Sequence, residues 1–386
     1  MDRATELELI DELLALKGQK THYLDAAVTR NPVDHYVNED RFAQERARIF
    51  RKVPMVAAHA SEISEPGDFI RREVAGLPLL LTRDKSGTAN AFLNACRHRG
   101  TRLVDDEKGC KHRFSCPYHA WTYANTGELL AAPHFDEGFE GVDKSSLGLQ
   151  SVQCVERFGF IWVTIEPEGA NGFDEFLDDL APEFDALRIE DMVVVHQDAL
   201  VHDANWKILV EGGIEAYHFK VAHRTTIGPH FEDNLSSYRM FGPHMRSILM
   251  RTSMAKLDPE TRDCWRLRDH AQVLYTLFPT SSLLVQQDHI AWILSEPVSA
   301  GQTRMRLSLL APRDWAGEAE HWARNHAITR TTLNEDFVIG ESIQSTLASG
   351  ANQNMLFGRF EGALDAFNKV VETYLEPATT PVAAAE

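Results

Sequence analysis

Two short segments of this chain each pair one cysteine with one histidine. Cys96 and His98 form the first pair, and Cys116 and His119 form the second after 17 intervening residues. Each pair follows a predicted strand, so two neighbouring loops can aim all four side chains at one point. Two thiolates on one iron and two imidazoles on a second iron are the ligands of one type of [2Fe-2S] cluster.

Zinc is the alternative metal for the same four side chains. Structural zinc sites with two cysteines and two histidines usually take their ligands as a close Cys pair and a close His pair. Here each loop supplies one of each, which favours the two-iron cluster. Cys110 and His112 lie between the two pairs and break the symmetry of the loops, so we interpret them as spacer residues.

A second group of ligand-type residues follows near the middle of the chain. Glu215 and His218 are three residues apart and would share a face of the helix predicted over residues 206–222. His218 and His223 would point about 140° apart on a straight helix, so the helix must bend or end if they share one ion. Two histidines with one carboxylate suit Fe(II) that activates O₂. Residues 334–344, a predicted helix with adjacent acids, are the best source of that carboxylate.

Both groups resemble motifs of the Rieske non-haem iron oxygenases, the α subunits of ring-hydroxylating enzymes. Residues 96–100 (CRHRG) and 116–121 (CPYHAW) are similar to their Rieske motif and lack the extra Cys that respiratory Rieske proteins carry in each loop. Residues 205–223 share an Asn-Trp-Lys lead-in, an acid, and two histidines at the family's spacing. Later in the chain, Asp336 is followed five residues on by Glu341, another feature of the family pattern.

The resemblance implies a role for each of these residues. Cys96, His98, Cys116 and His119 would bind a Rieske [2Fe-2S] cluster, and His218, His223 and Asp336 would hold a mononuclear Fe(II). Glu215 would be the bridging carboxylate that links a cluster histidine of one subunit to an iron ligand of its neighbour. Two departures stand out: Gly212 and Gly213 replace a common Asn-Phe pair, and the bridging acid is Glu, as in some members acting on quaternary ammonium compounds.

The pattern of apolar runs predicts an α+β fold. We expect an N-terminal helical part of the catalytic domain (1–50), a small antiparallel β Rieske domain (51–166), a larger catalytic domain with an antiparallel sheet and covering helices (167–376), and a flexible tail (377–386). The expected helices are 4–17, 39–50, 206–222, 318–347 and 360–374. The expected strands are 53–58, 69–74, 77–81, 89–95, 159–165, 193–201, 245–253, 273–277, 290–295 and 303–310.

Composition narrows the setting in which the protein works. The chain has 386 residues, with 39 Lys and Arg against 57 Asp and Glu, a formal charge of −18 that disfavours binding to nucleic acid. No apolar run reaches the ~18 residues of a membrane span, and the N-terminus lacks the pattern of a signal peptide. Five cysteines are too few for a disulfide framework. We therefore expect a cytoplasmic protein without membrane contact.

The family resemblance predicts an oxygenase that uses O₂ as co-substrate. Electrons would come from a ferredoxin or a flavin NAD(P)H reductase, a homotrimer would form, and a small aromatic or related organic substrate would be hydroxylated. Within the same family, N- or O-demethylation of a methylated or quaternary ammonium substrate is the alternative. A protein that only transfers electrons and a structural zinc protein are more distant alternatives.

Overall fold

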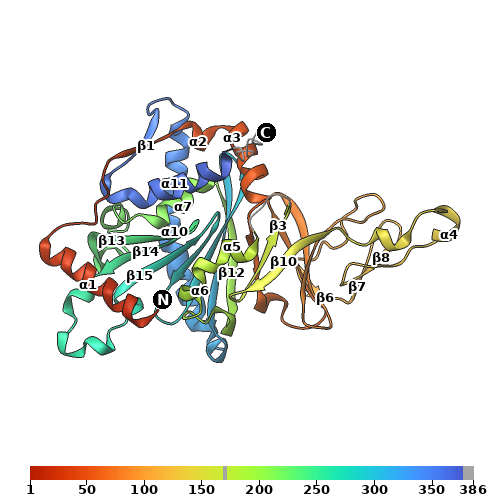
Figure 1. Cartoon of the computed structure of the whole chain (residues 1–386), viewed down its shortest axis with the longest axis horizontal. Helices are drawn as coiled ribbons and strands as arrows, with labels where there is room; N and C mark the ends of the chain where they lie inside the picture. Colours follow the sequence, from red (N-terminus) through yellow and green to blue (C-terminus); the bar gives the residue numbers. More distant parts are fainter. Residues whose placement is uncertain (168–171, 377–386) are drawn as a thin grey trace, which may run out of the picture.

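The computed structural model describes residues 1–167 and 172–376, so the tail expected at 377–386 lies outside the described residues. Two seven-stranded antiparallel sheets lie beside each other along the long axis (Figure 1). The expected α+β fold is confirmed. The described residues contain no helix that is both long enough and apolar enough to cross a membrane.

The first sheet and a smaller three-stranded sheet carry the two Cys/His loops. In order across the first sheet, the strands are β2 (Met55–His59), β11 (Phe160–Thr164), β10 (Ser151–Arg157), β5 (Ala89–Leu93), β4 (Leu77–Arg83), β3 (Asp68–Val74) and β6 (Lys108–Cys110). The smaller sheet contains β7 (Arg113–Ser115), β8 (Thr122–Ala124) and β9 (Leu129–Ala131). All five strands expected here are present, with ends shifted by one or two residues.

An apolar cluster separate from the main hydrophobic core packs against those loops. Phe69, Leu80 and Phe92 of the first sheet pack against Phe114 and Trp121 beside the second loop. Four of these five side chains are aromatic, and buried aromatic side chains contribute large apolar areas to a small core. The loops therefore pack on a hydrophobic core of their own at one end of the molecule (Figure 1).

The second sheet forms the larger part of the molecule. In order, its strands are β12 (Met192–His202), β18 (Gln302–Pro312), β17 (Ile290–Ser299), β16 (Ser281–Val285), β15 (Ala271–Leu277), β14 (His244–Arg251) and β13 (Phe231–Phe241). The helices are α1 (Arg3–Gln19), α2 (Asp34–Val37), α3 (Glu39–Glu45), α4 (Phe135–Gly138), α5 (Phe173–Leu177), α6 (Ala181–Phe184), α7 (Trp206–Ile214), α8 (Phe219–Ala222), α9 (Leu267–His270), α10 (Ala319–Leu347) and α11 (Gly362–Leu375). β1 (Thr29–Pro32) and β19 (Asn354–Phe357) form a separate pair.

Strand β13 was not expected from the sequence. Its residues are largely polar because it lies at the edge of the sheet and alternates between buried and exposed positions. Its pairing with β14 shifts between Phe231 and Ser236, and Asn234 adopts a positive φ of 50° in that interval. This irregularity interrupts the period-two alternation that would have marked the strand.

The single helix predicted over residues 206–222 is wrong. α7 ends at Ile214, Glu215 adopts an extended conformation with ψ 159°, and α8 begins at Phe219. Gly212 and Gly213 in the last turn of α7 lower its helix propensity and favour an early end. This break precedes both histidines. The end that the spacing of His218 and His223 requires lies at Ala222, where α8 stops before His223.

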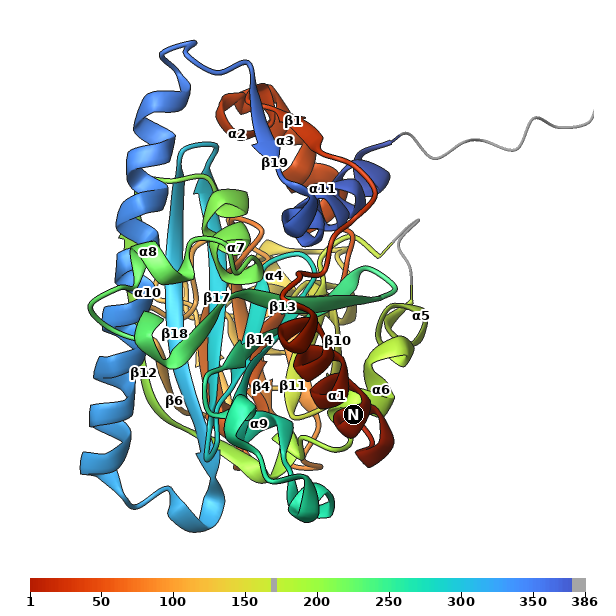
Figure 2. The ribbon, with the colours of Figure 1, turned by 90° about the vertical axis from the view of Figure 1, so that its left-hand side faces the viewer.

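Helix α10 runs beside β12 and β18 and crosses close to α7 (Figure 2). A Cβ atom at Gly340 would lie 2.8 Å from Cδ2 of Leu209 on α7, so a larger residue would require the Leu209 side chain to move. Asp336 lies four residues earlier, on the same face of α10. The close crossing therefore brings Asp336 to the region where α7 ends.

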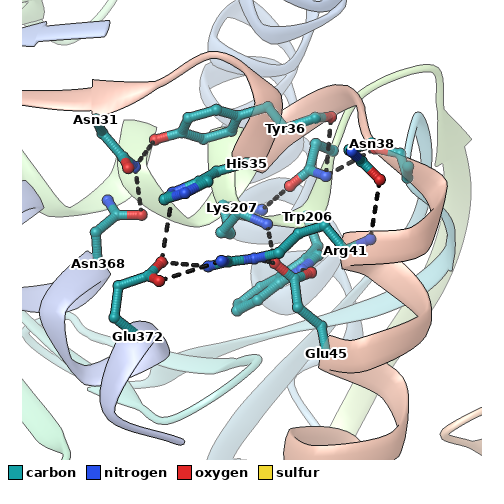
Figure 3. Close-up of polar contacts among 12 residues, drawn as sticks. Asn31, His35, Tyr36, Asn38, Arg41, Glu45, Trp206, Lys207, Asn368 and Glu372 are labelled. Atoms are coloured by element: carbon teal, nitrogen blue, oxygen red, sulfur yellow. Dashed lines mark hydrogen bonds and ion pairs between the residues drawn. The ribbon is translucent and has the colours of Figure 1, made fainter. Parts of the chain in front are cut away.

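A buried polar network ties α7 to α3 and α11 (Figure 3). Nζ of Lys207 lies 2.5 Å from Oε1 of Glu45, and both side chains are at most 1% exposed. Trp206 donates its indole N–H to the other carboxylate oxygen of Glu45 at 2.8 Å. Arg41 links Glu45 to Glu372 on α11. A buried ion pair held by further hydrogen bonds fixes one orientation of the helix.

Glu211, on the same helix, is buried without a cation in hydrogen-bond contact among the described residues. Its carboxyl accepts hydrogen bonds from the Tyr36 hydroxyl and from the Asn368 amide, each at 2.8 Å. Burial raises the pKa of Glu211 to about 7, although these hydrogen bonds and the charge of Lys207 act to lower the pKa. The Glu211 carboxyl is therefore mainly protonated below pH 7 and mainly charged above it.

Breaking the Glu45–Lys207 pair from one side should strongly destabilise the protein. We expect Glu45→Gln to lower the free energy of unfolding by about 3–5 kcal/mol, because Lys207 is left buried without a counter-ion. Urea unfolding followed by tryptophan fluorescence measures this change. The double variant Glu45→Met with Lys207→Met should recover most of the loss, and a double variant as unstable as the single one would contradict the argument.

The Glu211 carboxyl should make stability fall as pH rises. Its pKa is about 7 in the folded chain and about 4.5 when exposed, so the native state binds more protons between these values. The loss therefore develops between pH 4.5 and 7 and is complete above pH 7. Glu211→Gln should remove this trend and stabilise the protein at pH 8 by on the order of 3 kcal/mol.

Urea unfolding at pH 5 and pH 8 tests this expectation at constant metal content. Glu8→Gln, at an exposed position of α1, is the matched control for loss of one negative charge. A stability gain at pH 8 no larger in Glu211→Gln than in Glu8→Gln would refute the explanation.

Candidate metal centres

The two Cys/His loops are conformational copies of each other. In the first, the Cys96 N–H donates to the Thr101 carbonyl and the Gly100 N–H donates back to the Cys96 carbonyl, each at 2.8 Å. In the second, the Cys116 and Ala120 N–H groups make the equivalent bonds at 2.8 and 2.9 Å. Gly100 and Ala120 both adopt a positive φ, 77° and 56°. Each loop thus folds back on its own cysteine.

The loops bring the four predicted cluster residues together. The Nδ1 atoms of His98 and His119 lie 3.1 Å apart at the surface end. Cys96 and Cys116 lie deeper: the exposed fraction is 3% for Cys96 and 4% for Cys116. Neither cysteine forms a disulfide. Two buried thiols beneath two outer imidazoles fit a cluster whose inner iron takes sulfur and whose outer iron takes nitrogen.

Neighbouring side chains orient this group. The Trp121 ring stacks on His98 with ring centroids 5.0 Å apart and an angle of 12°. The Tyr123 hydroxyl lies 3.4 Å from Sγ of Cys96 and accepts the Arg97 N–H at 3.0 Å. Sequence reasoning missed Tyr123, because a tyrosine in a short strand carries no signal of such a contact. Cys110 and His112 lie against Gly67 instead.

The second centre joins residues from the break between α7 and α8 to residues of α10. Nε2 of His218 lies 3.2 Å from Nε2 of His223, and Oδ1 of Asp336 lies 3.4 and 3.0 Å from these two atoms. Ligands about 2.1 Å from a metal and at right angles to one another are about 3 Å apart. The three atoms therefore fit one face of an octahedral metal site.

Hydrogen bonds leave these three atoms free to bind a metal. Nδ1 of His218 contacts the Glu215 carboxylate, and Nδ1 of His223 lies 2.6 Å from the Glu335 carboxylate. A carboxylate accepts, so each Nδ1 carries the proton and each Nε2 keeps its lone pair. Oδ1 of Asp336 is buried without a hydrogen-bond partner among the described residues. Such donor atoms suit a divalent cation.

Two details of this centre differ from the sequence interpretation. Glu215 contacts His218 through a non-helical turn rather than across a helix face, and the Tyr217 and His218 N–H groups also donate to its carboxylate. Glu335 was recognised only as one of two adjacent acids. Its neighbour Asp336 faces the imidazoles directly, whereas Glu335 reaches Nδ1 of His223 from the side and accepts from the Thr226 hydroxyl at 2.7 Å.

The carboxylates give the centre a field that attracts positive charge. Burial disfavours a charged His218, but Asp336 and Glu215 outweigh this effect and raise the pKa of His218 to about 10. A proton and a metal cation respond to the same field, because each brings a positive charge to the imidazole nitrogens.

Two cavities meet at this centre. One, of about 390 Å³, is lined by Glu211, Glu215 and His218. The other, of about 240 Å³, is lined by His223 and lies against the second sheet. Asp336 lines both. The three side chains therefore stand between two separate spaces, each of which reaches a different histidine.

Comparison with protein families divides the chain into two matches. Residues 53–155 match the Rieske [2Fe-2S] domain, and residues 189–377 match the catalytic domain of the ring hydroxylating alpha subunit. Together the two models match about three quarters of the chain. These domains imply a Rieske cluster and a mononuclear iron that uses O₂.

Proteins similar in sequence to this chain include the large subunits of two oxygenases. The anthranilate 1,2-dioxygenase large subunit of Acinetobacter baylyi is 33% identical over 196 residues, 49% of this chain and 41% of that protein. The carnitine monooxygenase oxygenase subunit of Acinetobacter pittii is 29% identical over 241 residues, 60% of this chain and 63% of that protein. The chain thus spans about half the length of the relatives it matches.

Solved structures of the same fold cover nearly the whole chain. A quaternary ammonium Rieske monooxygenase in complex with L-carnitine has a TM-score of 0.77 at 24% identity and covers 91% of this chain and 97% of its own. Naphthalene 1,2-dioxygenase from Rhodococcus sp. has a TM-score of 0.77 at 19% identity and covers 97% and 99%. With these two matched domains and related large subunits, the chain belongs to the family of Rieske oxygenase α subunits.

Proposed function

We propose that this chain is the oxygenase component of a multicomponent enzyme that hydroxylates an aromatic or related organic substrate with O₂. The convergence of His218, His223 and Asp336 beside a cavity, in a chain that also has a Rieske domain, carries this proposal. Electrons would enter from a ferredoxin or a flavin NAD(P)H reductase. The domains would be residues 51–166 for the cluster, and 1–50 with 167–376 for catalysis.

We assign the cluster to Cys96, Cys116, His98 and His119. The buried thiols would hold the inner iron, and the outer imidazoles would hold the iron nearer the surface. Neutral imidazoles in place of two thiolates reduce the negative charge of the cluster and raise its reduction potential. Partly exposed histidines also place the electron-accepting iron where a protein partner can approach.

We assign the mononuclear Fe(II) to His218, His223 and Asp336. When bound there, Fe(II) supplies the activation of O₂ in positions that the protein leaves open. Glu215 and Glu335 hold the Nδ1 protons of the two histidines and so fix the orientation of both rings. Substrate would occupy the smaller cavity, whose apolar wall excludes water from the reacting carbon.

Electrons would reach this iron from a second copy of the chain. Strands β7 and β8 beside the second Cys/His loop lie at one end of the molecule, whereas α7 lies within the larger part (Figure 1). We infer that a neighbouring copy of the chain offers a more direct route than the cluster of the same chain. Glu215 lines the larger cavity together with the exposed side chains of Ile339 and Leu356, which are 43% and 61% exposed. We propose that a neighbour's His119 or His98 meets Glu215 here, in a homotrimer.

Demethylation is the second candidate reaction. Relatives named for carnitine and glycine betaine, and the choice of Glu at position 215, favour it. Such an enzyme releases formaldehyde after hydroxylating a methyl group. An aromatic cage for a quaternary ammonium group is what the cavity would need, and its aromatic rings other than histidine are Phe219 and Phe231.

Changing Asp336 tests the core of the proposal. We expect Asp336→Ala to retain the Rieske absorption spectrum but to lose at least about tenfold in bound mononuclear iron and about 100-fold in turnover. Turnover is read with a surrogate reductase, ¹⁸O₂ and a panel of aromatic acids, hydrocarbons, methylated amines and quaternary ammonium compounds. Label in a ring product supports ring hydroxylation, whereas formaldehyde in step with O₂ consumption supports demethylation.

Two results would count against the leading proposal. Unchanged electron transfer and no oxygenation in either the native protein or Asp336→Ala would indicate an electron-transfer protein. A colourless native protein that contains zinc would exclude the cluster. His119→Ala is the complementary variant, because it should lose the Rieske spectrum while the mononuclear site is intact.

Changing Glu215 should slow electron transfer between the centres more than it lowers iron content. We expect Glu215→Gln to reduce the rate at which substrate and O₂ oxidise the reduced cluster by about 10–100-fold. Stopped-flow absorbance of the cluster measures this rate. Glu335→Gln is the matched control, because it changes the Nδ1 partner of His223 away from the proposed route. Equal slowing in the two variants would contradict the bridging role.

A further inference from the structure

The cavity beside His223 contains one fixed positive charge apart from its histidines. Arg251, the last residue of β14, lines this cavity, and its only acidic lining residue is Asp336. Asp336 belongs to the proposed iron site, so a bound metal ion would neutralise its negative charge. The rest of the lining therefore presents a net positive charge to any molecule inside.

Arg251 lacks a close counter-ion. Among the described residues, no carboxylate oxygen lies within 4 Å of its guanidinium, and Asp269 is the one acid whose charge acts on it from farther away. One N–H donates to Oε1 of Gln286 at 3.1 Å, and Nε is buried without a partner. Desolvation lowers the pKa of Arg251. Burying a cation without a partner is costly, and a bound anion would offset that cost.

The guanidinium is held in place before any ligand arrives. It lies over the Phe231 ring, 5.3 Å from the ring centroid, and Gln286 fixes one of its edges. The backbone carbonyl of Gln286 accepts a hydrogen bond from Nε of Arg268 at 2.9 Å, which fixes Gln286 in turn. A planar guanidinium fixed in this way suits two parallel hydrogen bonds to a carboxylate.

An apolar stretch separates Arg251 from the iron site. Phe231 contacts Phe219 with ring centroids 5.1 Å apart, and Phe219 contacts His223 at 4.9 Å. Leu274 and Leu284 line the same cavity. A ligand held at Arg251 would thus place an apolar body along these rings and reach toward the metal with its far end.

A second polar side chain marks the same cavity. His289 is 4% exposed, its Nδ1 lies 2.7 Å from Asp288, and its Nε2 has no partner among the described residues. Gln272 also lines this space. Polar groups gathered beside one partly buried cation indicate a site built for a polar end group rather than for a wholly apolar molecule.

We propose that Arg251 binds a carboxylate on the substrate and so orients its apolar end toward the iron site. This inference rests on the proposed function, because it takes the smaller cavity as the substrate pocket. It names the substrate class as a monoanionic carboxylate with an apolar body. A substrate with a cationic group and no carboxylate would be repelled by Arg251, and a wholly neutral hydrocarbon would leave the guanidinium desolvated and unpaired.

Direct binding tests this proposal without turnover. Calorimetry at pH 7.5 compares benzoate, phenylacetate, 3-phenylpropionate and hexanoate, each against its primary amide, on the holoprotein. We expect at least one acid to bind at least about tenfold more tightly than its amide. Arg251→Met should lose this preference while it binds the amide as before, which shows that the cavity is intact. Arg251→Lys should retain part of the preference.

The control is Arg266→Met, an exposed position that removes the same charge from the protein. The proposal is overturned if no acid binds, if amides match the acids in the native protein, or if Arg251→Met keeps the preference. These results are separate from the proposed function. Acid binding through Arg251 in a protein that oxygenates nothing would refute the oxygenase, and an oxygenase indifferent to Arg251 would refute only this inference.

Discussion

Three electron-pair donors that face one another within 3.4 Å are the constraint on which the catalytic half of this molecule depends. Two imidazole lone pairs and a carboxylate oxygen repel one another unless a cation lies between them. Only a scaffold that fixes each side chain can keep them so close. The short helix α8 has His218 at its start and His223 at its end, and the close helix crossing at Gly340 brings Asp336 near them.

Much of that scaffold consists of buried polar side chains, and burying them carries a desolvation cost in free energy. Lys207, the partner of Glu45, and the hydrogen-bonded Glu211 both lie on α7, about three and two helical turns before His218. Apolar packing alone would allow α7 to slide or rotate, because apolar contacts are not directional. Directional hydrogen bonds from three other segments set its rotation, and with it the direction in which the chain leaves at Glu215 (Figure 3).

The candidate metal ligands could be predicted from the sequence, whereas the residues that hold those ligands in place could not. Cys96 and Cys116 each occur with a histidine at short spacing, and the spacing of His218 and His223 required a break in a helix. Glu335, Tyr123 and Arg251 act through contacts made only in the folded chain, between segments that are distant in sequence. The long predicted helix was wrong for a related reason, since apolar periodicity continues through Ala216 and Phe219 although the backbone turns between them.

Because Asp336 lines two cavities, the site has two sides with different surroundings. His218 and its partner Glu215 face the larger cavity, where apolar side chains are exposed, and His223 faces the smaller one, where Arg251 lies. In the function proposed here, one face of the His218, His223 and Asp336 site would receive electrons from a neighbouring protein, and the other would hold a small molecule. Gly212 lines both cavities and Gly213 lines the smaller one, and a larger side chain at either position would project toward Asp336 or Leu274. These two glycines thus leave room on the side where a substrate would meet the metal.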